Sequence, residues 1–410
     1  VVLAILVSTF TAVVMERVSL SYAFAIVLVL CIGSVGVAEC ADEACRDGTC
    51  ASNLNDLRKV LADSEDVADY VVRVRRELHL QPELMWTETK TSAVVKRELR
   101  AMGVSFEEVS APGVVATIGS GSAPVVALRA DMDALPVTEE SDIPVERRSQ
   151  VPGKMHACGH DGHTAMLLGA AKVLKSVEGS LRGTVRLVFQ PAEEGGAGGR
   201  KMLEDGLRTM RPAIESSFAL HNWPYPETPS GVVGTRPGTI MAGSGAFEIT
   251  LTGAGGHAAV PHKNIDVVVC GSAVVMAMQT IVSRLTDPLD SALITVTVFD
   301  AGGDAENVMV DTARLLGQFH AVDKRTLEWI HGAIVKETVG IAAAHGCDAD
   351  VTFTPVLPDG NVREEYPPTV NDVKAAALAS SVATGMFGAD AVVDVAPVMP
   401  AEDFSFFADF

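Results

Sequence analysis

The string MHACGHDGH at positions 155–163 concentrates side chains that bind transition metals. Cys158 and His160 lie two positions apart in it, and a thiolate with an imidazole suits zinc and manganese-like ions. The glycines beside them let the backbone bend so that both side chains converge on one ion. We therefore predict that Cys158 and His160 are metal ligands. For His163 and His156, capping of the following helix and packing, respectively, are the favoured interpretations.

Two adjacent carboxylates, Glu193 and Glu194, follow the apolar run VRLVFQ at positions 185–190. Pro191 ends the predicted strand, so the pair lies in a loop. There one carboxylate can bind a metal ion while the other takes a proton from a water whose pKa the metal lowers toward neutrality. A glutamate pair is most often solvated surface, but its place directly after a buried strand favours a role in chemistry.

Two further clusters of polar side chains follow apolar runs. Asp131 and Asp133 come after VVALRA, and His221 comes after SFAL. In an open α/β sheet, ligands bind in the crevice beyond the carboxyl ends of the strands. We therefore predict that these side chains and the glutamate pair meet at one site.

Another histidine, His257, follows two glycines in a predicted loop, and His262 lies five residues later. A histidine in such a loop can reach a substrate and donate a hydrogen bond to a developing oxyanion. A loop histidine without a function is the alternative interpretation, and the sequence leaves both open.

The apolar pattern predicts the elements that position these clusters. Residues 54–99 have a helical pattern that the proline of HLQPEL divides in two. Apolar runs predict buried parallel strands joined by a helix, namely strands 125–128, 185–189 and 217–220 and helix 164–177. Strands alternating with helices indicate the α/β class, here a catalytic domain with a parallel-rich sheet.

From about Gly243 the pattern changes to strands with one apolar face. The elements then follow the order β-α-β-β-α-β, which is the ferredoxin-like arrangement. They are strand 247–252, helix 265–285, strand 294–298, strand 315–322, helix 324–345 and strand 351–356. After Pro358 a helix, a strand and the start of another helix resume the first domain, which this insert interrupts.

We predict four segments along the chain. They are a leader at 1–50, the first part of the catalytic domain at 51–241, the inserted domain at 242–357 and the second part of the catalytic domain at 358–410. A chain of 410 residues exceeds what one hydrophobic core usually supports, which fits two domains. Its 52 acidic and 32 basic side chains give a formal charge of −20, which would repel a phosphate backbone. We therefore expect no nucleic acid partner.

Residues 18–38 form a run of apolar and small side chains behind the charged head MER at 15–17, which resembles a secretory signal peptide. An uncleaved membrane anchor is the alternative, because the run is nearly long enough to span a bilayer. Cys40, Cys45 and Cys50 cluster just after it, as suits a compartment that permits disulfides. We expect the secretory pathway, either the ER lumen or secretion, with membrane contact only through this leader.

Seven motifs in the same order resemble the amidohydrolase branch of the M20 metallopeptidase family. They are RRELHLQPEL, ALRADMDALPV, GKMHACGHDGHTAMLLGAAKVL, VFQPAEEGGAGGRKML, ALHNWP, GGHAAVPH and MPAEDFSFF, and the match runs from about Val67 to Phe410. That branch includes auxin (indole-3-acetic acid) amino acid conjugate hydrolases, hippurate hydrolases and bacterial N-acyl amino acid amidohydrolases. The resemblance implies a metal-dependent amidohydrolase that acts on linear amides.

The resemblance also implies a role for each cluster. A pair of divalent metal ions, Mn²⁺ or Zn²⁺, would be held by the ligands Cys158, His160, Glu194 and His221. Asp133 would lie behind these ligands. Glu193 would be the general base for attack of a metal-bound water on the amide carbonyl, and would return the proton to the leaving amine.

In this family the inserted ferredoxin-like unit is a lid or dimerisation domain, and a histidine at the position of His257 faces the substrate. The resemblance therefore implies a homodimer through the inserted domain, with His257 helping to stabilise the oxyanion. The implied substrate is a small-molecule N-acyl amino acid or a conjugate of the indole-3-acetic acid type.

Three departures from the family pattern bear on these expectations. The family has one more histidine ligand after the EDF motif, whereas this sequence stops at Phe410, so we expect a C-terminally truncated chain. NVMVD at 307–311 lacks the proline of the usual NVIPD. His320 stands where the family usually has an arginine, and if that arginine grips the substrate carboxylate, a histidine weakens the grip and makes it depend on pH.

Two alternatives to the metal enzyme stay open at this point. Cys158 activated by His160 would make a thiol hydrolase, which would survive chelators. A secreted binding protein that kept the fold but lost turnover is the other, and the absent final histidine and His320 are its support. The sequence does not predict the preferred acyl group, the amino acid or the metal, since several divalent ions suit this donor set.

Overall fold

The computed structural model describes residues 2–7, 62–63, 65–223, 231–303, 305–356, 360 and 362–409. The predicted signal peptide or anchor and the three clustered cysteines lie outside these residues. The chain divides into two compact units. Unit 1 comprises Val1–Ile240, Val370–Ala396 and Phe406–Phe410, and unit 2 comprises Met241–Thr369 and Pro397–Ser405.

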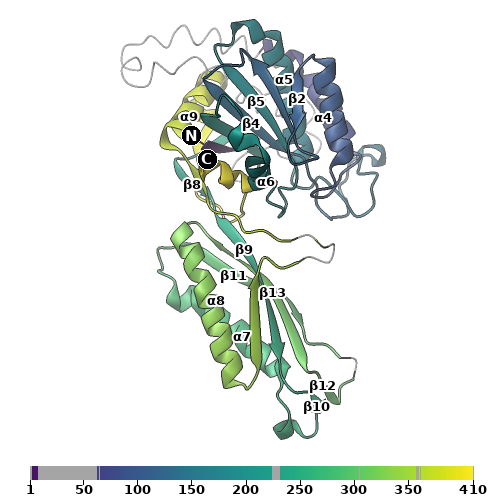
Figure 1. Cartoon of the computed structure of the whole chain (residues 1–410), viewed down its shortest axis with the longest axis vertical. Helices are drawn as coiled ribbons and strands as arrows, with labels where there is room; N and C mark the ends of the chain where they lie inside the picture. Colours follow the sequence, from purple (N-terminus) through teal and green to yellow (C-terminus); the bar gives the residue numbers. More distant parts are fainter. Residues whose placement is uncertain are drawn as a thin grey trace. The chain divides into compact units, whose positions relative to one another are not determined.

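An eight-stranded sheet forms the centre of unit 1, in the order β16-β7-β1-β6-β4-β5-β3-β2 (Figure 1). Its strands are β1 (Val2–Val7), β2 (Ser105–Glu108), β3 (Val114–Gly119), β4 (Val125–Asp131), β5 (Thr184–Gln190), β6 (Ser216–Asn222), β7 (Val233–Thr235) and β16 (Val392–Asp394). β4 is parallel to β5 and β6, and β6 is parallel to β1. β4 and β5 are buried along their whole length, as strands covered on both faces are. The predicted α/β class with a parallel-rich sheet is confirmed.

The helices that cover this sheet include α3 (Ala68–His79), α4 (Thr89–Ala101), α5 (His160–Ser176), α6 (Gly198–Asp205) and α9 (Val373–Phe387). α5 packs against α3, α4 and β4, and almost all of its residues are buried. It begins four residues before the predicted start at 164, because Gly159 adopts a left-handed conformation with φ 93° and turns the chain into the helix there. His160 therefore lies in the first turn of α5.

Unit 2 has a four-stranded antiparallel sheet in the order β11-β13-β9-β14. Its strands are β9 (Gly243–Thr252), β11 (Ala292–Asp300), β13 (Thr312–Ala321) and β14 (Asp348–Phe353), and its helices are α7 (Val267–Thr280) and α8 (Lys324–Ala344). In β9 alternate residues are buried, and Phe247, Ile249 and Leu251 pack into an apolar core that includes residues of both helices. The larger elements follow the order β-α-β-β-α-β, and the role of this unit as a lid or dimerisation domain stays a prediction.

α7 continues into a π-helical turn at Ile281–Leu285. Together they form a helix of 19 residues that is long and apolar enough to cross a membrane by composition alone. Core helices of soluble proteins pass the same test, and α7 packs against α8 and the sheet of unit 2. One face of α7, with Val267, Cys270, Val274 and Met278, therefore belongs to the core of unit 2.

Shorter elements complete the described chain. β8 (Gly238–Met241) pairs with β15 (Thr369–Asn371), and β10 (Gly256–His257) pairs with β12 (Val308–Met309). Short 3₁₀ helices lie at Val145–Arg147, Glu178–Ser180, Leu207–Thr209, Pro261–Lys263, Ala389–Ala391 and Asp403–Asp409.

Candidate metal centre

The two ring nitrogens of His160 face different carboxylates. Nδ1 faces Asp133, and Nε2 lies 3.7 Å from Asp131 and 3.9 Å from Glu194. Its Nδ1 lies 3.2 Å from Oδ1 of Asp133, two residues beyond the end of β4. A carboxylate only accepts hydrogen bonds, so Nδ1 carries a proton, and in the neutral ring the lone pair is on Nε2. Nε2 is buried and has no hydrogen-bond partner among the described residues. This is the state of a histidine prepared to bind a metal ion.

Cys158 and His221 lie beside this nitrogen. His221 is at the carboxyl end of β6, and its Nε2 is 3.5 Å from Sγ of Cys158. Its Nδ1 donates to the backbone oxygen of Asn222 at 2.5 Å, which fixes the tautomer with the lone pair on Nε2. Cys158, His160 and His221 each offer a ligand atom, and these atoms lie within 4.8 Å of one another.

Glu193 and Glu194 reach the same place from the loop after β5. His160, Glu193 and Glu194 form a second group whose ligand atoms lie within 4.8 Å of one another. The backbone N–H of Glu194 donates to Oδ2 of Asp133 at 2.9 Å. Asp133 thus contacts both the His160 ring and the Glu194 backbone, and lies behind two of the predicted ligands.

The charges of the site fit a cation. Burial opposes protonation of His160, but the negative charges of Asp131 and Cys158 outweigh it and raise the pKa of His160 well above its usual value. Burial also raises the pKa of the Cys158 thiol. A soft donor set with a buried, unpartnered imidazole nitrogen therefore fits divalent transition metals.

His163 does not cap α5, contrary to the interpretation favoured from the sequence. Its Nδ1 donates to Oδ1 of Asp131 at 2.6 Å, and its Nε2 accepts the backbone N–H of Asn222 at 2.9 Å. Arg129 donates to the other carboxylate oxygen of Asp131, also at 2.6 Å. Both ring nitrogens of His163 are engaged, so its ring holds the backbone next to His221. His163 lies three residues after His160 on one face of α5, which is the sequence signal for this role.

His156 behaves as the sequence analysis favoured. It is 4% exposed, and neither ring nitrogen has a hydrogen-bond partner among the described residues. Burial lowers its pKa to about 4, so the ring is neutral and packs as an apolar group at physiological pH.

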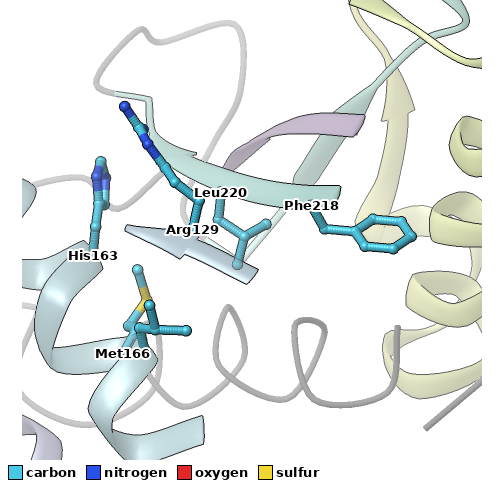
Figure 2. A pocket seen from close by; sticks show the side chains of 6 residues that line it. Arg129, His163, Met166, Phe218 and Leu220 are labelled. Carbon is cyan, nitrogen blue, oxygen red and sulfur yellow. The ribbon is translucent and has the colours of Figure 1, made fainter. Parts of the chain in front are cut away.

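A small cavity is lined by residues of β4, β6 and α5 (Figure 2). Figure 2 shows Arg129 and His163 pointing to the same side, and Met166, Leu167, Phe218 and Leu220 supply the apolar part of the lining. The cavity lining, among the described residues, contains none of the four predicted ligands. We therefore do not assign it to the substrate.

Two sequence-predicted residues belong to unit 2. His257 is exposed on β10, and its Nδ1 accepts the N–H of Ala259 at 3.1 Å. His320 donates through Nδ1 to the backbone oxygen of Met399 at 2.8 Å, and its Nε2 lies 3.0 Å from Oε1 of Gln318. Burial lowers the pKa of His320, which leaves it neutral near pH 7. The predicted role of His257 at the oxyanion stays a prediction.

One buried carboxyl of this region was missed from the sequence. Glu88 is 0% exposed, and its Oε1 accepts the backbone N–H of Ala192, next to Glu193. Its segment, WTETK, is polar and reads as a helix start, so no local pattern indicated burial. Burial of a carboxyl without a positive partner is visible only in the folded chain.

Comparison with known proteins agrees with the geometry. Residues 127–410 match the peptidase family M20/M25/M40. IAA-amino acid hydrolase ILR1-like 5 of Arabidopsis thaliana is 44% identical over 366 residues, which cover 88% of this chain and 81% of that protein. N-acetyl-L-cysteine deacetylase of Bacillus subtilis is 37% identical over 341 residues, covering 83% and 77% of the two chains.

Solved structures show the same fold. The YxeP protein of Bacillus subtilis, a dinuclear metal-binding peptidase of the M20 family, is 31% identical, with 83% of this chain and 85% of that chain covered and a TM-score of 0.65. A structure from methicillin-resistant Staphylococcus aureus is also 31% identical, with 83% and 84% covered and a TM-score of 0.71. The resemblance drawn from the seven motifs is confirmed, and with it the class of metal-dependent amidohydrolases. The chain belongs to the M20/M25/M40 peptidase family.

Proposed function

We propose that this protein hydrolyses the amide bond of N-acyl amino acids, including conjugates of indole-3-acetic acid with amino acids. The observation that carries the proposal is the convergence of Cys158, His160, His221 and the glutamate pair at the carboxyl ends of neighbouring strands. Relatives that act on IAA-amino acids and on N-acetyl-L-cysteine support this class of substrate.

The metal centre supplies Lewis acid chemistry when loaded, by polarising the amide carbonyl and lowering the pKa of the attacking water. The ligands from this chain would be Cys158, His160, Glu194 and His221. Two divalent ions, Mn²⁺ or Zn²⁺, are proposed because the donors are a thiolate, imidazoles and a carboxylate. The YxeP protein, which is a dinuclear metal-binding peptidase, supports the proposed number of two ions.

Glu193 is proposed as the general base. Its side chain is 6% exposed and lies within the group formed with His160 and Glu194. A carboxylate at this place takes the proton from the attacking water and later gives it to the leaving amine, so one residue serves both steps. Asp133 keeps His160 and the Glu194 backbone in position during both steps.

The thiol hydrolase alternative is not favoured. A nucleophilic cysteine needs a lowered pKa, whereas burial raises the pKa of Cys158. The binding protein alternative is not favoured either, since relatives that are 44% identical to this chain are hydrolases by name. We further propose a homodimer through unit 2, His257 as a donor to the oxyanion, and a place in the secretory pathway.

A substrate panel with metal control tests the proposal. N-acyl amino acids and indole-3-acetyl amino acids are incubated with the metal-loaded protein, and the released amino acid is measured. We expect turnover that a chelator abolishes and that Mn²⁺ or Zn²⁺ restores. Absence of turnover on the whole panel, with two ions bound per chain, would contradict the proposed function. Turnover that persists after complete metal removal would revive the Cys158 mechanism.

A further inference from the structure

The segment that joins α3 to α4 touches the chain on two sides of the metal centre. The backbone oxygen of Glu83 accepts the N–H of Ala134 at 2.8 Å, directly after Asp133. Further along, Trp86 packs against the loop after β5. The contact is so close that a Cβ added at Gly196 would lie 2.6 Å from the indole nitrogen. The segment 83–88 therefore connects the ends of β4 and β5.

Glu88 contacts the residue next to the proposed base. Its Oε1 accepts the backbone N–H of Ala192 at 2.7 Å, and Ala192 directly precedes the proposed base Glu193. On the other side of Glu193, the N–H of Glu194 donates to Asp133 at 2.9 Å. Two buried carboxyl groups thus hold the backbone immediately before and after the base.

This loop needs such support because its backbone is turned into an uncommon conformation. Ala192 has φ 56° and Ala197 has φ 51°, in the left-handed region that side chains with a Cβ rarely adopt. A Cβ on Gly198 would lie 1.6 Å from the backbone oxygen of Pro191, so the chain folds tightly onto itself. Contacts from outside the loop must keep it in this form.

Glu88 is free to make this contact because another residue caps α4. Glu88 occupies the N-cap position, yet its side chain makes no capping hydrogen bond. Oε2 of Glu83 accepts the N–H groups of Lys90 and Thr91 instead, at 2.8 and 2.9 Å. The Glu88 side chain turns toward the Ala192 loop.

We propose that Glu88 is a positioning residue for amide hydrolysis, which holds the Ala192 N–H and thereby fixes the direction of the Glu193 carboxylate. The inference rests on the proposed role of Glu193 as the base. Glu88 itself touches neither substrate nor ligand in this role, and its effect is on turnover through the geometry of the base.

The chemical form of Glu88 gives the proposal a sharp test. Burial, together with the charge of Asp133, raises the pKa of Glu88 to about 8. The side chain is therefore mainly a neutral acid at pH 7. Only Oε1 is used, since Oε2 has no hydrogen-bond partner among the described residues. A glutamine presents a carbonyl oxygen in the same position. The contact with the Ala192 N–H therefore requires an acceptor of this shape and does not require a negative charge.

The experiment compares Glu88→Gln and Glu88→Ala in the metal-loaded full chain. We expect Glu88→Ala to lower kcat about 100-fold, as misplacement by roughly 1 Å does, with KM and bound metal nearly unchanged. Glu88→Gln should keep kcat within about fivefold of the parent on the same reasoning. Thr184→Val is the matched control, because it removes a hydrogen bond to the backbone oxygen of Ser122 from a buried side chain at the opposite end of β5 from the loop.

The outcomes distinguish the assignment of Glu193 as the base from that of Glu88 as the positioning residue. Full turnover of Glu88→Ala overturns the positioning role, as does a loss in Glu88→Gln as large as in Glu88→Ala. If Glu88→Ala does not fold, Glu88→Met fills a similar volume without the acceptor, and full turnover of that variant overturns the role equally. Full activity of Glu193→Ala would reject the base assignment and this inference with it, whereas an inactive Glu193→Ala beside a fully active Glu88→Ala rejects the inference alone.

Discussion

Unit 1 and the segment Met241–Thr369 of unit 2 fill their interiors with different kinds of side chain. Between Met241 and Thr369, the buried polar side chains that the structure describes are three threonines. Unit 1 instead buries ionisable groups where β4, β5 and β6 end, among them Asp131, Asp133 and His160. Burial of such groups costs free energy unless they are paired, so their concentration in one place marks chemistry rather than packing.

In unit 1, aspartates at the end of β4 form hydrogen bonds to the histidines of the site. Asp133 holds His160, and Asp131 holds His163, which holds the backbone beside His221. Each predicted histidine ligand thus has a fixed orientation set by groups that themselves lie outside the ligand set. Changes in these groups should affect metal affinity and turnover, whereas a change in the Glu248–Arg314 pair on the sheet of unit 2 should affect stability alone.

The largest effect is expected from the base. Glu193→Gln should lower kcat about 10²–10⁴-fold, the usual contribution of a general base, because glutamine cannot take a proton. Bound metal, measured by elemental analysis, should stay at the parent level. Glu204→Gln on the exposed side of α6 is the control and should be indistinguishable from the parent. Loss of both ions in Glu193→Gln would show that Glu193 is a ligand instead.

Asp133→Ala should come next. It removes the acceptor of His160 Nδ1 and of the Glu194 N–H, and loss of such a group typically weakens metal affinity about 10–100-fold. Titration calorimetry with Mn²⁺ or Zn²⁺ measures the change directly. Unchanged affinity would mean that the ligands hold their positions without Asp133.

His163→Gln should have a smaller effect of the same kind. The ring acts on His221 through the Asn222 backbone, so we expect metal affinity to fall about tenfold, at the lower end of the range for groups behind a ligand. Calorimetry on the same ions provides the comparison with Asp133→Ala. A loss of affinity greater than that of Asp133→Ala would indicate that His163 binds the metal itself.

The smallest effect concerns stability and tests the contrast between the units away from the metal. Burial raises the pKa of Glu98 on α4, but hydrogen bonds from Arg97 and Arg73 outweigh it and leave that pKa below its ordinary value. Glu98 therefore stabilises unit 1 above its unfolded pKa of about 4.3, and this contribution is lost as the pH falls through the folded pKa. Glu98→Gln should cost about 1–2 kcal/mol at pH 7, as charged hydrogen bonds do, and the difference from the parent should shrink below about pH 4.

A pair on unit 2 is the control for that measurement. Glu248 forms a two-pronged contact with Arg314, but the arginine is 41% exposed. Glu248→Gln should therefore cost less, about 0–1 kcal/mol, in urea unfolding at the same pH. A larger loss for Glu248→Gln than for Glu98→Gln would contradict the contrast between the units.

The sequence predicted the fold class because its evidence is local. Runs such as 125–128 and 185–189 are apolar without interruption, and strands buried on both faces require this. It also predicted which residues gather, since polar residues after parallel strands share one edge of the sheet. Residues 1–50 were predicted to be a leader, whereas Val2–Val7 form β1 between β6 and β7, because strand pairing depends on long-range contacts that no local pattern encodes.

The supporting contacts of the site were predicted least well. His163 was interpreted as a cap because it stands near the start of a helix, but the start lies at His160, and three residues into the helix a side chain no longer caps it. Glu88 was overlooked since its partner, Ala192, is 104 positions away. Backbone groups carry no signature in the sequence, so a side chain that binds one cannot be paired with it before folding.

The parallel pairing of β4 with β5 and β6 has a consequence for how the enzyme can change. Asp131 is opposite Gln190, and Arg129 is opposite Ala219, so the rungs of backbone hydrogen bonds fix the relative register of the ends of β4, β5 and β6. A slip by one rung would move a neighbour by about 3.3 Å and turn it to the opposite face. The register of these three strands therefore limits where Asp133, Glu193 and His221 can lie, because each of them stands at or just beyond the end of a strand.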